Sequence, residues 1–138
     1  MEKNNIYAVI DTNVIVSALL SHNIQSSTYI VFDAILNGKI TPIYNEDILN
    51  EYLEVLSRDK FPFQKEDIDM VATLITRSGL KLERTKVIDE IFPDPKDIVF
   101  YEVAMSKDDA YLVTGNIKHF PKKPFVVTPA EMVEILNL

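Results

Sequence analysis

Residues 6–17 read Ile6-Tyr7-Ala8-Val9-Ile10-Asp11-Thr12-Asn13-Val14-Ile15-Val16-Ser17. An apolar run of strand length ends in a carboxylate, and a second apolar run with helical potential follows the polar triplet at once. This order is typical of a buried parallel strand that leads into a helix. Ligands of open α/β sheets bind outside the carboxyl ends of the strands, so Asp11 is expected to face a cleft. The alternative is that Asp11 only caps the helix.

The composition describes one domain of 138 residues that is 47% hydrophobic and contains no cysteine. Disulfides, thiolate metal sites and cysteine nucleophiles are therefore excluded. The first residues lack the layout of a signal peptide, and no apolar run is long enough to cross a bilayer, which together predict a cytoplasmic protein. The net charge of -7 argues against a surface that is basic throughout. A nucleic acid would have to meet a local basic patch or bound cations.

Helical and strand patterns alternate along the chain without a repeat or a linker, which predicts a single α/β domain over residues 1–138 with a mostly parallel sheet. Proline is poorly tolerated in the middle of a sheet, so Pro42 predicts a second strand that is short or near an edge. We expect strands at 6–10, 39–44, 110–114 and 125–127, an ambiguous stretch at 80–88, and helices at 14–20, 28–37, 46–56, 64–78, 95–105 and 129–136.

A second acidic stretch runs from Phe92 to Ile98. Asp94 at the cap position, Pro95 at the first helical position and Asp97 at the third predict a strong helix start. Capping accounts well for Asp94. It accounts less completely for Asp97, because aspartate is a weaker partner than glutamate in a capping box, and the side chain is free to project into a neighbouring cleft.

Three further polar residues attract attention. Glu51 lies beside the apolar stripe of the helix that Asn45 is expected to cap, so its carboxylate must reach water, pair with a cation or join a metal site. A simple solvated flank is the alternative. Thr114 and Asn116 follow a buried strand, where Asn116 could also serve only as a turn residue.

The concentrated basic patch of the chain lies near its C-terminus, with Phe120 available for base stacking. It predicts an RNA contact, although a charge run of this length is also typical of solvated surface. Its members are Lys118, His119, Lys122 and Lys123. The basic residues of the stretch from Arg58 to Phe63 are interpreted as a solvated turn.

The strand-end residues Asp11, Asp97 and Asn116 are expected at one edge of the sheet, and Glu51 joins them if its helix crosses nearby. Such an oxygen-only set suits Mg²⁺ or Mn²⁺ better than zinc or copper. A divalent cation would relieve the repulsion between the carboxylates. It would also activate a water and stabilise the charge that develops on a phosphodiester.

Four motifs resemble the PIN domain family, a ribonuclease fold found in the toxins of many bacterial and archaeal toxin-antitoxin pairs, including the VapC group. They span nearly the whole chain and are Ile10-Asp11-Thr12-Asn13 with Val14 to Ser17, Leu49-Asn50-Glu51-Tyr52-Leu53, Asp94-Pro95-Lys96-Asp97 and Leu112-Val113-Thr114-Gly115-Asn116. The resemblance implies a three-layer α/β/α fold, a Mg²⁺-dependent endoribonuclease, frequent homodimerisation and, for a toxin, a cognate antitoxin as partner.

By position, the resemblance makes Asp11, Glu51 and Asp97 the catalytic, metal-binding acids. Asn13, Ser17 and Thr114 would then orient them. Many PIN domains have aspartate where this chain has Asn116, so one negative charge is lost. The amide oxygen can still bind the metal directly or through water, which implies weaker metal binding, and Asp94 could compensate.

The leading hypothesis is therefore a Mg²⁺- or Mn²⁺-dependent endoribonuclease that is the toxin of a prokaryotic toxin-antitoxin pair. The alternative is a catalytically weak or inactive PIN-fold module that binds RNA or a partner protein. A phosphatase ranks last, because that chemistry needs a second acid two residues after the nucleophile and position 13 is Asn.

Overall fold

The computed structural model describes residues 5–84 and 91–137, so part of the ambiguous stretch at 80–88 lies outside the described residues. Its sheet has the order β3-β2-β1-β4-β5, with every neighbouring pair parallel. The predicted α/β class and parallel sheet are confirmed. The strands are β1 (Ile6–Ile10), β2 (Ile40–Tyr44), β3 (Leu80–Lys81), β4 (Tyr111–Val113) and β5 (Val126–Val127).

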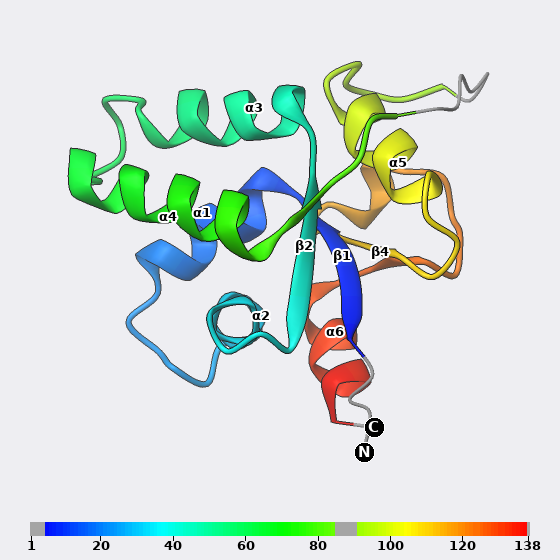
Figure 1. Ribbon diagram of the computed structural model, residues 1–138, viewed down its shortest axis with the longest axis horizontal. Helices are drawn as coiled ribbons and strands as arrows, with labels where there is room; N and C mark the ends of the chain where they lie inside the picture. Colours follow the sequence, from blue (N-terminus) through cyan, green and yellow to red (C-terminus); the bar gives the residue numbers. More distant parts are fainter. Residues whose placement is uncertain (1–4, 85–90, 138) are drawn as a thin grey trace.

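Helices cover both faces of this sheet. In Figure 1, α1 to α4 lie to one side of β1 and β2, and α5 lies to the other. The C-terminal helix α6 packs against α2. The helices are α1 (Thr12–Leu20), α2 (Ser27–Leu36), α3 (Glu46–Leu56), α4 (Lys65–Ser78), α5 (Asp97–Met105) and α6 (Pro129–Leu136), with a short 3-10 turn η1 (Ile117–His119).

Successive strands are added on one side of β1 and then on its other side. From β1 the chain moves outward to β2 and β3, and α5 then returns it to β4 on the other side of β1. The carboxyl ends of β1 and β4 therefore flank the point where the strand order switches. Crevices of open α/β sheets form at such points, and Asp11 directly follows β1 there.

The core lies on both faces of the central strands. Ala8, Val9 and Ile10 are successive residues of β1 and all are buried, as are Leu112 and Val113 of β4. Continuous burial along a strand is typical of a parallel sheet with helices on both faces. The edge of the sheet where these strands end is thus a rigid base for polar side chains.

Local helix-start signals are confirmed at two places. Asn45 accepts a hydrogen bond from the Ile48 amide at 2.9 Å and caps α3. Thr128 and Glu131 form the full capping box of α6, with Pro129 at the first helical position. Both caps depend only on residues within one turn, which is why the sequence predicts them well.

The second strand lies near an edge of the sheet, as predicted, because its neighbour β3 is the outermost strand. β2 lies between β1 and β3. Pro42 is tolerated because β3 is only two residues long and pairs with Ile43 and Tyr44, so β3 does not reach Pro42. The side of β2 at Pro42 that faces away from β1 is left without a strand, as at a sheet edge.

The predicted start of the fifth helix is wrong by two residues. α5 begins at Asp97, and Lys96 occupies the cap position with helical backbone angles and no side-chain cap. Asp94 instead forms a turn before the helix, because its Oδ1 accepts a hydrogen bond from the Lys96 amide at 3.0 Å. Its carbonyl accepts another from the Asp97 amide at 3.0 Å. Asp97 is therefore the first helical residue rather than the third.

Candidate active site

A pocket of about 240 Å³ lies where the carboxyl end of β1 meets the start of α5, and we call it the acidic pocket. Residues from α1, α3, α5 and the turn after β4 all reach it. Four acids and three basic groups line it, together with polar and apolar neighbours. The lining residues are Asp11, Thr12, Asn13, Glu51, Val55, Arg58, Asp94, Lys96, Asp97, Phe100, Asn116 and His119.

Asp11 is held at the base of the acidic pocket. Its amide donates to the Val113 carbonyl at 2.9 Å, which extends the pairing of β1 with β4 by one residue. Its carboxylate accepts a hydrogen bond from the Thr114 hydroxyl at 2.7 Å and is only 6% exposed. Asp11 occupies the cap position of α1, but its side chain makes no capping hydrogen bond. The first-turn amides of Thr12 and Asn13 still lower the pKa of the carboxylate, but burial outweighs them and the pKa is raised overall.

Thr114 connects Asp11 to the other side of the pocket. While its hydroxyl donates to Asp11, its oxygen accepts a hydrogen bond from the Asn116 amide at 2.9 Å. Thr114 is fully buried. This chain of contacts fixes the Asp11 carboxylate relative to the turn that carries Asn116.

Tyr52 fastens α3 to the sheet next to Asp11. Its hydroxyl donates to the carbonyl of Ile10, and the ring is buried. Burial and the negative charge of Asp11 both raise the pKa of the Tyr52 hydroxyl, so it remains a neutral donor. This contact sets the distance of α3 from β1, and with it the approach of Glu51 to the pocket.

Two carboxylates of the pocket, those of Asp97 and Asp11, have raised pKa values. Burial, followed by the charges of Asp11 and Asp94, raises the pKa of Asp97 to about 6. His119 offsets part of this effect, because its Nδ1 lies 3.6 Å from Asp97 Oδ2. Burial also raises the pKa of Asp11, against the opposing effect of the Thr114 hydrogen bond. Without a counter-ion, the folded chain thus holds these negative charges at a cost.

The acids share one pocket without forming a ready-made metal site. In residues 5–84 and 91–137, no group of three or more acidic or histidine side chains is arranged to hold a metal ion directly. Glu51, Asn13, Asp94 and Asn116 line the acidic pocket beside Asp11 and Asp97. The expected convergence at one edge of the sheet is present, but it is looser than a closed set of ligands.

Other predicted site residues lie elsewhere. Ser17 is exposed on α1 and does not line the acidic pocket, so its position does not support a role in orienting the acids. Lys118, Lys122 and Lys123 line a second pocket of about 260 Å³, together with Ile117, Phe120 and Val126. Of the predicted basic patch, only His119 reaches the acidic pocket.

The proposed stacking role of Phe120 is wrong. Its side chain is only 6% exposed, and its ring contacts Phe92 edge-on with the ring centroids 6.1 Å apart. A ring buried to this extent has too little exposed surface for a base to stack on it, even though Phe120 borders the second pocket.

Sequence reasoning missed three polar residues of the acidic pocket. Arg58 and Lys96 line it, although Arg58 was interpreted as part of a solvated turn. The signal for Arg58 was the spacing from Glu51, since residues seven apart lie on one face of a helix. Thr12 also lines the pocket, and its buried hydroxyl has no hydrogen-bond partner among the described residues.

Comparison with known proteins agrees with this architecture. Residues 7–118 match the PIN domain family. The chain belongs to the PIN domain family. Its fold is similar to that of a chain in the crystal structure of VapBC2 from Rickettsia felis bound to a DNA fragment from their promoter. That match has a TM-score of 0.55 and 19% sequence identity, and covers 89% of this chain and 97% of the other.

The family and the three-layer fold predicted from the sequence are thereby confirmed. A comparison with curated proteins finds no significant match. None of the helices in the described part of the chain has the length and apolar character needed to cross a membrane. The PIN domain assignment and the acidic pocket together direct attention to nuclease chemistry.

Proposed function

We propose that this protein is a Mg²⁺- or Mn²⁺-dependent endoribonuclease that cleaves RNA at the acidic pocket. The observation that carries the proposal is the placement of Asp11 and Asp97. Both line a pocket at the switch point of the sheet, and neither side chain caps its helix. Membership of the PIN domain family supports the same chemistry.

The donor set of the pocket fits a hard divalent cation. Carboxylate and amide oxygens line the pocket. The charges of Asp11 and Asp94 add to burial in raising the pKa of Asp97, and a cation would relieve this repulsion between the acids. The buried Thr12 hydroxyl has no hydrogen-bond partner within residues 5–84 and 91–137, so it still needs one. Mg²⁺ usually keeps several waters and binds only one or two carboxylates, so a loose arrangement of acids suits it.

In this proposal Asp11 and Asp97 hold the ion, with Glu51 and the amide oxygen of Asn116 acting directly or through water. Thr114 orients Asp11 by its hydrogen bond. Asn13 and Asp94, which also line the pocket, help to orient the acids and the water around them. When bound, the cation supplies an activated water and stabilises negative charge on the phosphodiester.

RNA would contact both pockets. His119 belongs to the acidic pocket, whereas Lys118, Lys122 and Lys123 line the second pocket on the same stretch of chain. We propose that these lysines hold the RNA backbone away from the scissile bond. Lysine contacts to phosphate are insensitive to sequence, so they would add affinity rather than selectivity.

A toxin role and its partners extend the proposal. The fold resembles a chain of the VapBC2 structure, in which the proteins are bound to DNA from their promoter. We infer that this chain is the toxin of a pair, has a cognate antitoxin protein, and forms a homodimer. Co-expression with the product of a small adjacent reading frame, followed by size-exclusion chromatography, tests both partners.

Cleavage of fluorescent single-stranded and hairpin RNAs tests the enzyme directly. Purified protein is assayed with Mn²⁺, with Mg²⁺ and with EDTA, beside the Asp11→Asn variant. The matched control is Asp108→Asn, which removes an exposed acid from the turn before β4, at the opposite end of that strand from Asn116. Cleavage that needs metal and is lost only in Asp11→Asn supports the proposal. Equal cleavage by wild type and Asp11→Asn contradicts it.

A second candidate is a PIN-fold module that binds RNA or a protein without turnover. It is favoured by Asn116, where many PIN domains have a fourth acid, and by the lack of a closed acidic cluster in the described residues. Such a module would bind RNA in a gel-shift assay and leave it uncleaved with Mn²⁺, with Mg²⁺ and with EDTA.

A further inference from the structure

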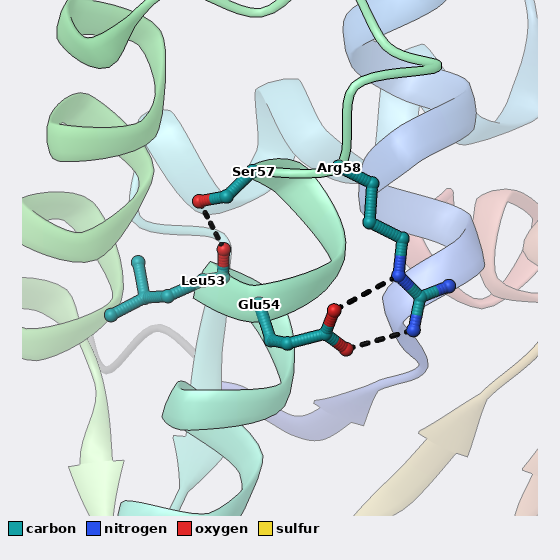
Figure 2. Close-up of polar contacts among 4 residues, drawn as sticks. All are labelled: Leu53, Glu54, Ser57 and Arg58. Atoms are coloured by element: carbon teal, nitrogen blue, oxygen red, sulfur yellow. Dashed lines mark hydrogen bonds and ion pairs between the residues drawn. The ribbon is translucent and has the colours of Figure 1, made fainter.

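Arg58 lies at the rim of the acidic pocket, just after α3 ends. The Arg58 amide donates to the Val55 carbonyl at 3.2 Å, and the Phe61 amide donates to the Arg58 carbonyl at 3.0 Å. Before it, the Ser57 hydroxyl donates to the Leu53 carbonyl at 2.7 Å, as Figure 2 shows. The backbone that carries Arg58 is thus held on both sides.

The guanidinium of Arg58 is held by Glu54. Nε donates to Glu54 Oε2 at 3.0 Å, and Nη2 donates to Oε1 at 2.7 Å, so that the two groups meet edge to edge (Figure 2). The side chains remain 40% and 56% exposed. Exposed pairs one helical turn apart contribute little to stability. The clearer effect of this pair is to fix the direction of the guanidinium.

One edge of the guanidinium remains available. The pair with Glu54 uses Nε and Nη2, and no group in the described part of the chain is hydrogen-bonded to Nη1. The hydrogen bond to Glu54, followed by the charges of Glu54 and Glu51, raises the pKa of Arg58. The group therefore stays charged. A free, charged guanidinium edge matches the oxygens of a phosphate.

We propose that Arg58 binds a backbone phosphate of the RNA next to the acidic pocket, and that Glu54 is a positioning residue that presents its guanidinium. The inference rests on the proposed nuclease function and assigns the α3 side of the pocket to the substrate. In a chain of net charge -7, it gives the RNA a guanidinium edge beside the acids.

Binding is measured without cleavage in the Asp11→Asn protein with Mn²⁺, by fluorescence anisotropy of a fluorescein-labelled single-stranded RNA of mixed sequence. Adding Arg58→Gln is expected to weaken binding about tenfold, as loss of a charged hydrogen bond does. The slope of log K against log salt should fall by about 0.7, because one phosphate contact is lost. Arg58→Lys keeps the charge and should restore the slope. Arg77→Gln, an exposed arginine on α4, is the matched control.

Glu54 is tested by a double-mutant cycle. Glu54→Gln is expected to weaken RNA binding when Arg58 is present and to have no effect once Arg58→Gln has been introduced. Asp59→Asn removes an equal charge from the neighbouring exposed turn and should not weaken binding. In the protein with Asp11 intact, Arg58→Gln should raise KM for RNA cleavage and leave kcat nearly unchanged.

The outcomes separate this inference from the proposed function. If the protein neither cleaves nor binds RNA, both are overturned. If it cleaves RNA with metal, but Arg58→Gln matches Arg77→Gln in affinity and in salt slope, the Arg58 inference alone is overturned. The free edge of the Arg58 guanidinium would then be explained by a contact with a carboxylate of a partner protein.

Discussion

The helices α5 and α6 each carry one acid in their first turn, but the two acids have different roles in the structure. At α6, the Glu131 side chain is part of the helix cap and of no site. Its carboxylate accepts a hydrogen bond from the Thr128 amide at 2.8 Å, and the Thr128 hydroxyl accepts one from the Glu131 amide at 3.1 Å. At α5, Asp97 makes no such cap, lies in a pocket with other acids, and has its pKa raised to about 6. Glu131 thus stabilises the fold by capping a helix, whereas the charged form of Asp97 is disfavoured by the fold. Such unfavourable placement is typical of functional sites.

The largest expected difference between the two starts is in activity. Asp97→Asn should lower Mn²⁺-dependent RNA cleavage by about a hundredfold or more, because a ligand of the proposed ion is lost. Glu131→Gln should leave the cleavage rate close to that of the wild type. The rates are compared at saturating Mn²⁺ on one fluorescent RNA, and equal losses in the two variants would break the contrast.

Stability should change in the opposite sense at the two starts. In EDTA at neutral pH, Asp97→Asn should raise the free energy of unfolding by about 1 kcal/mol, since it removes a carboxylate that burial and neighbouring acids disfavour. Thr128→Ala should lower it by about 1 kcal/mol, because the cap of α6 is lost. Urea unfolding followed by circular dichroism measures both. A destabilised Asp97→Asn protein would mean that the carboxylate has a structural role.

The same difference predicts a dependence on pH. Asp97 has a pKa of about 6 in the folded chain against its ordinary value of 3.8, so the folded state binds more protons between these values. Stability without metal should therefore fall as the pH rises from about 4 to about 6. In Asp97→Asn this fall should be smaller, with the part due to Asp11 remaining. Identical pH profiles of the two proteins would count against the raised pKa.

The smallest expected effect belongs to Glu131→Gln. Glutamine can still accept the Thr128 amide, so the capping box is kept and only the charge near the helix N-terminus is lost. The free energy of unfolding should fall by a few tenths of a kcal/mol, roughly the value of one exposed helix-dipole interaction. A loss much larger than that of Thr128→Ala would show that Glu131 has contacts beyond the cap.

The sequence predicted features that depend on neighbouring residues better than features that depend on long-range packing. The caps at Asn45 and Thr128 were predictable because their partners lie within one turn. The parallel sheet and the acids at its edge followed from the order of apolar runs and polar strand ends. The local signal at Asp94 and Pro95 was less accurate, because it placed the start of α5 two residues too early.

The features that the sequence did not predict depend on long-range packing. The approach of Glu51 and Arg58 to Asp11 is set by Tyr52, whose partner Ile10 lies 42 residues away. Phe120 was assigned to base stacking, but it is buried against Phe92, which no local pattern indicates. The number of acids near the sheet edge was predictable, whereas their spacing and the basic residues among them were not.

The central claim is that the acidic pocket takes up a divalent cation, and isothermal titration of Mn²⁺ into the purified protein tests it most directly. The account predicts binding to the wild type and to Glu131→Gln, and loss of that binding in Asp11→Asn and Asp97→Asn. If the wild type binds no Mn²⁺, or if Asp97→Asn binds it as tightly as the wild type does, the acids of this pocket are not metal ligands and the account is contradicted.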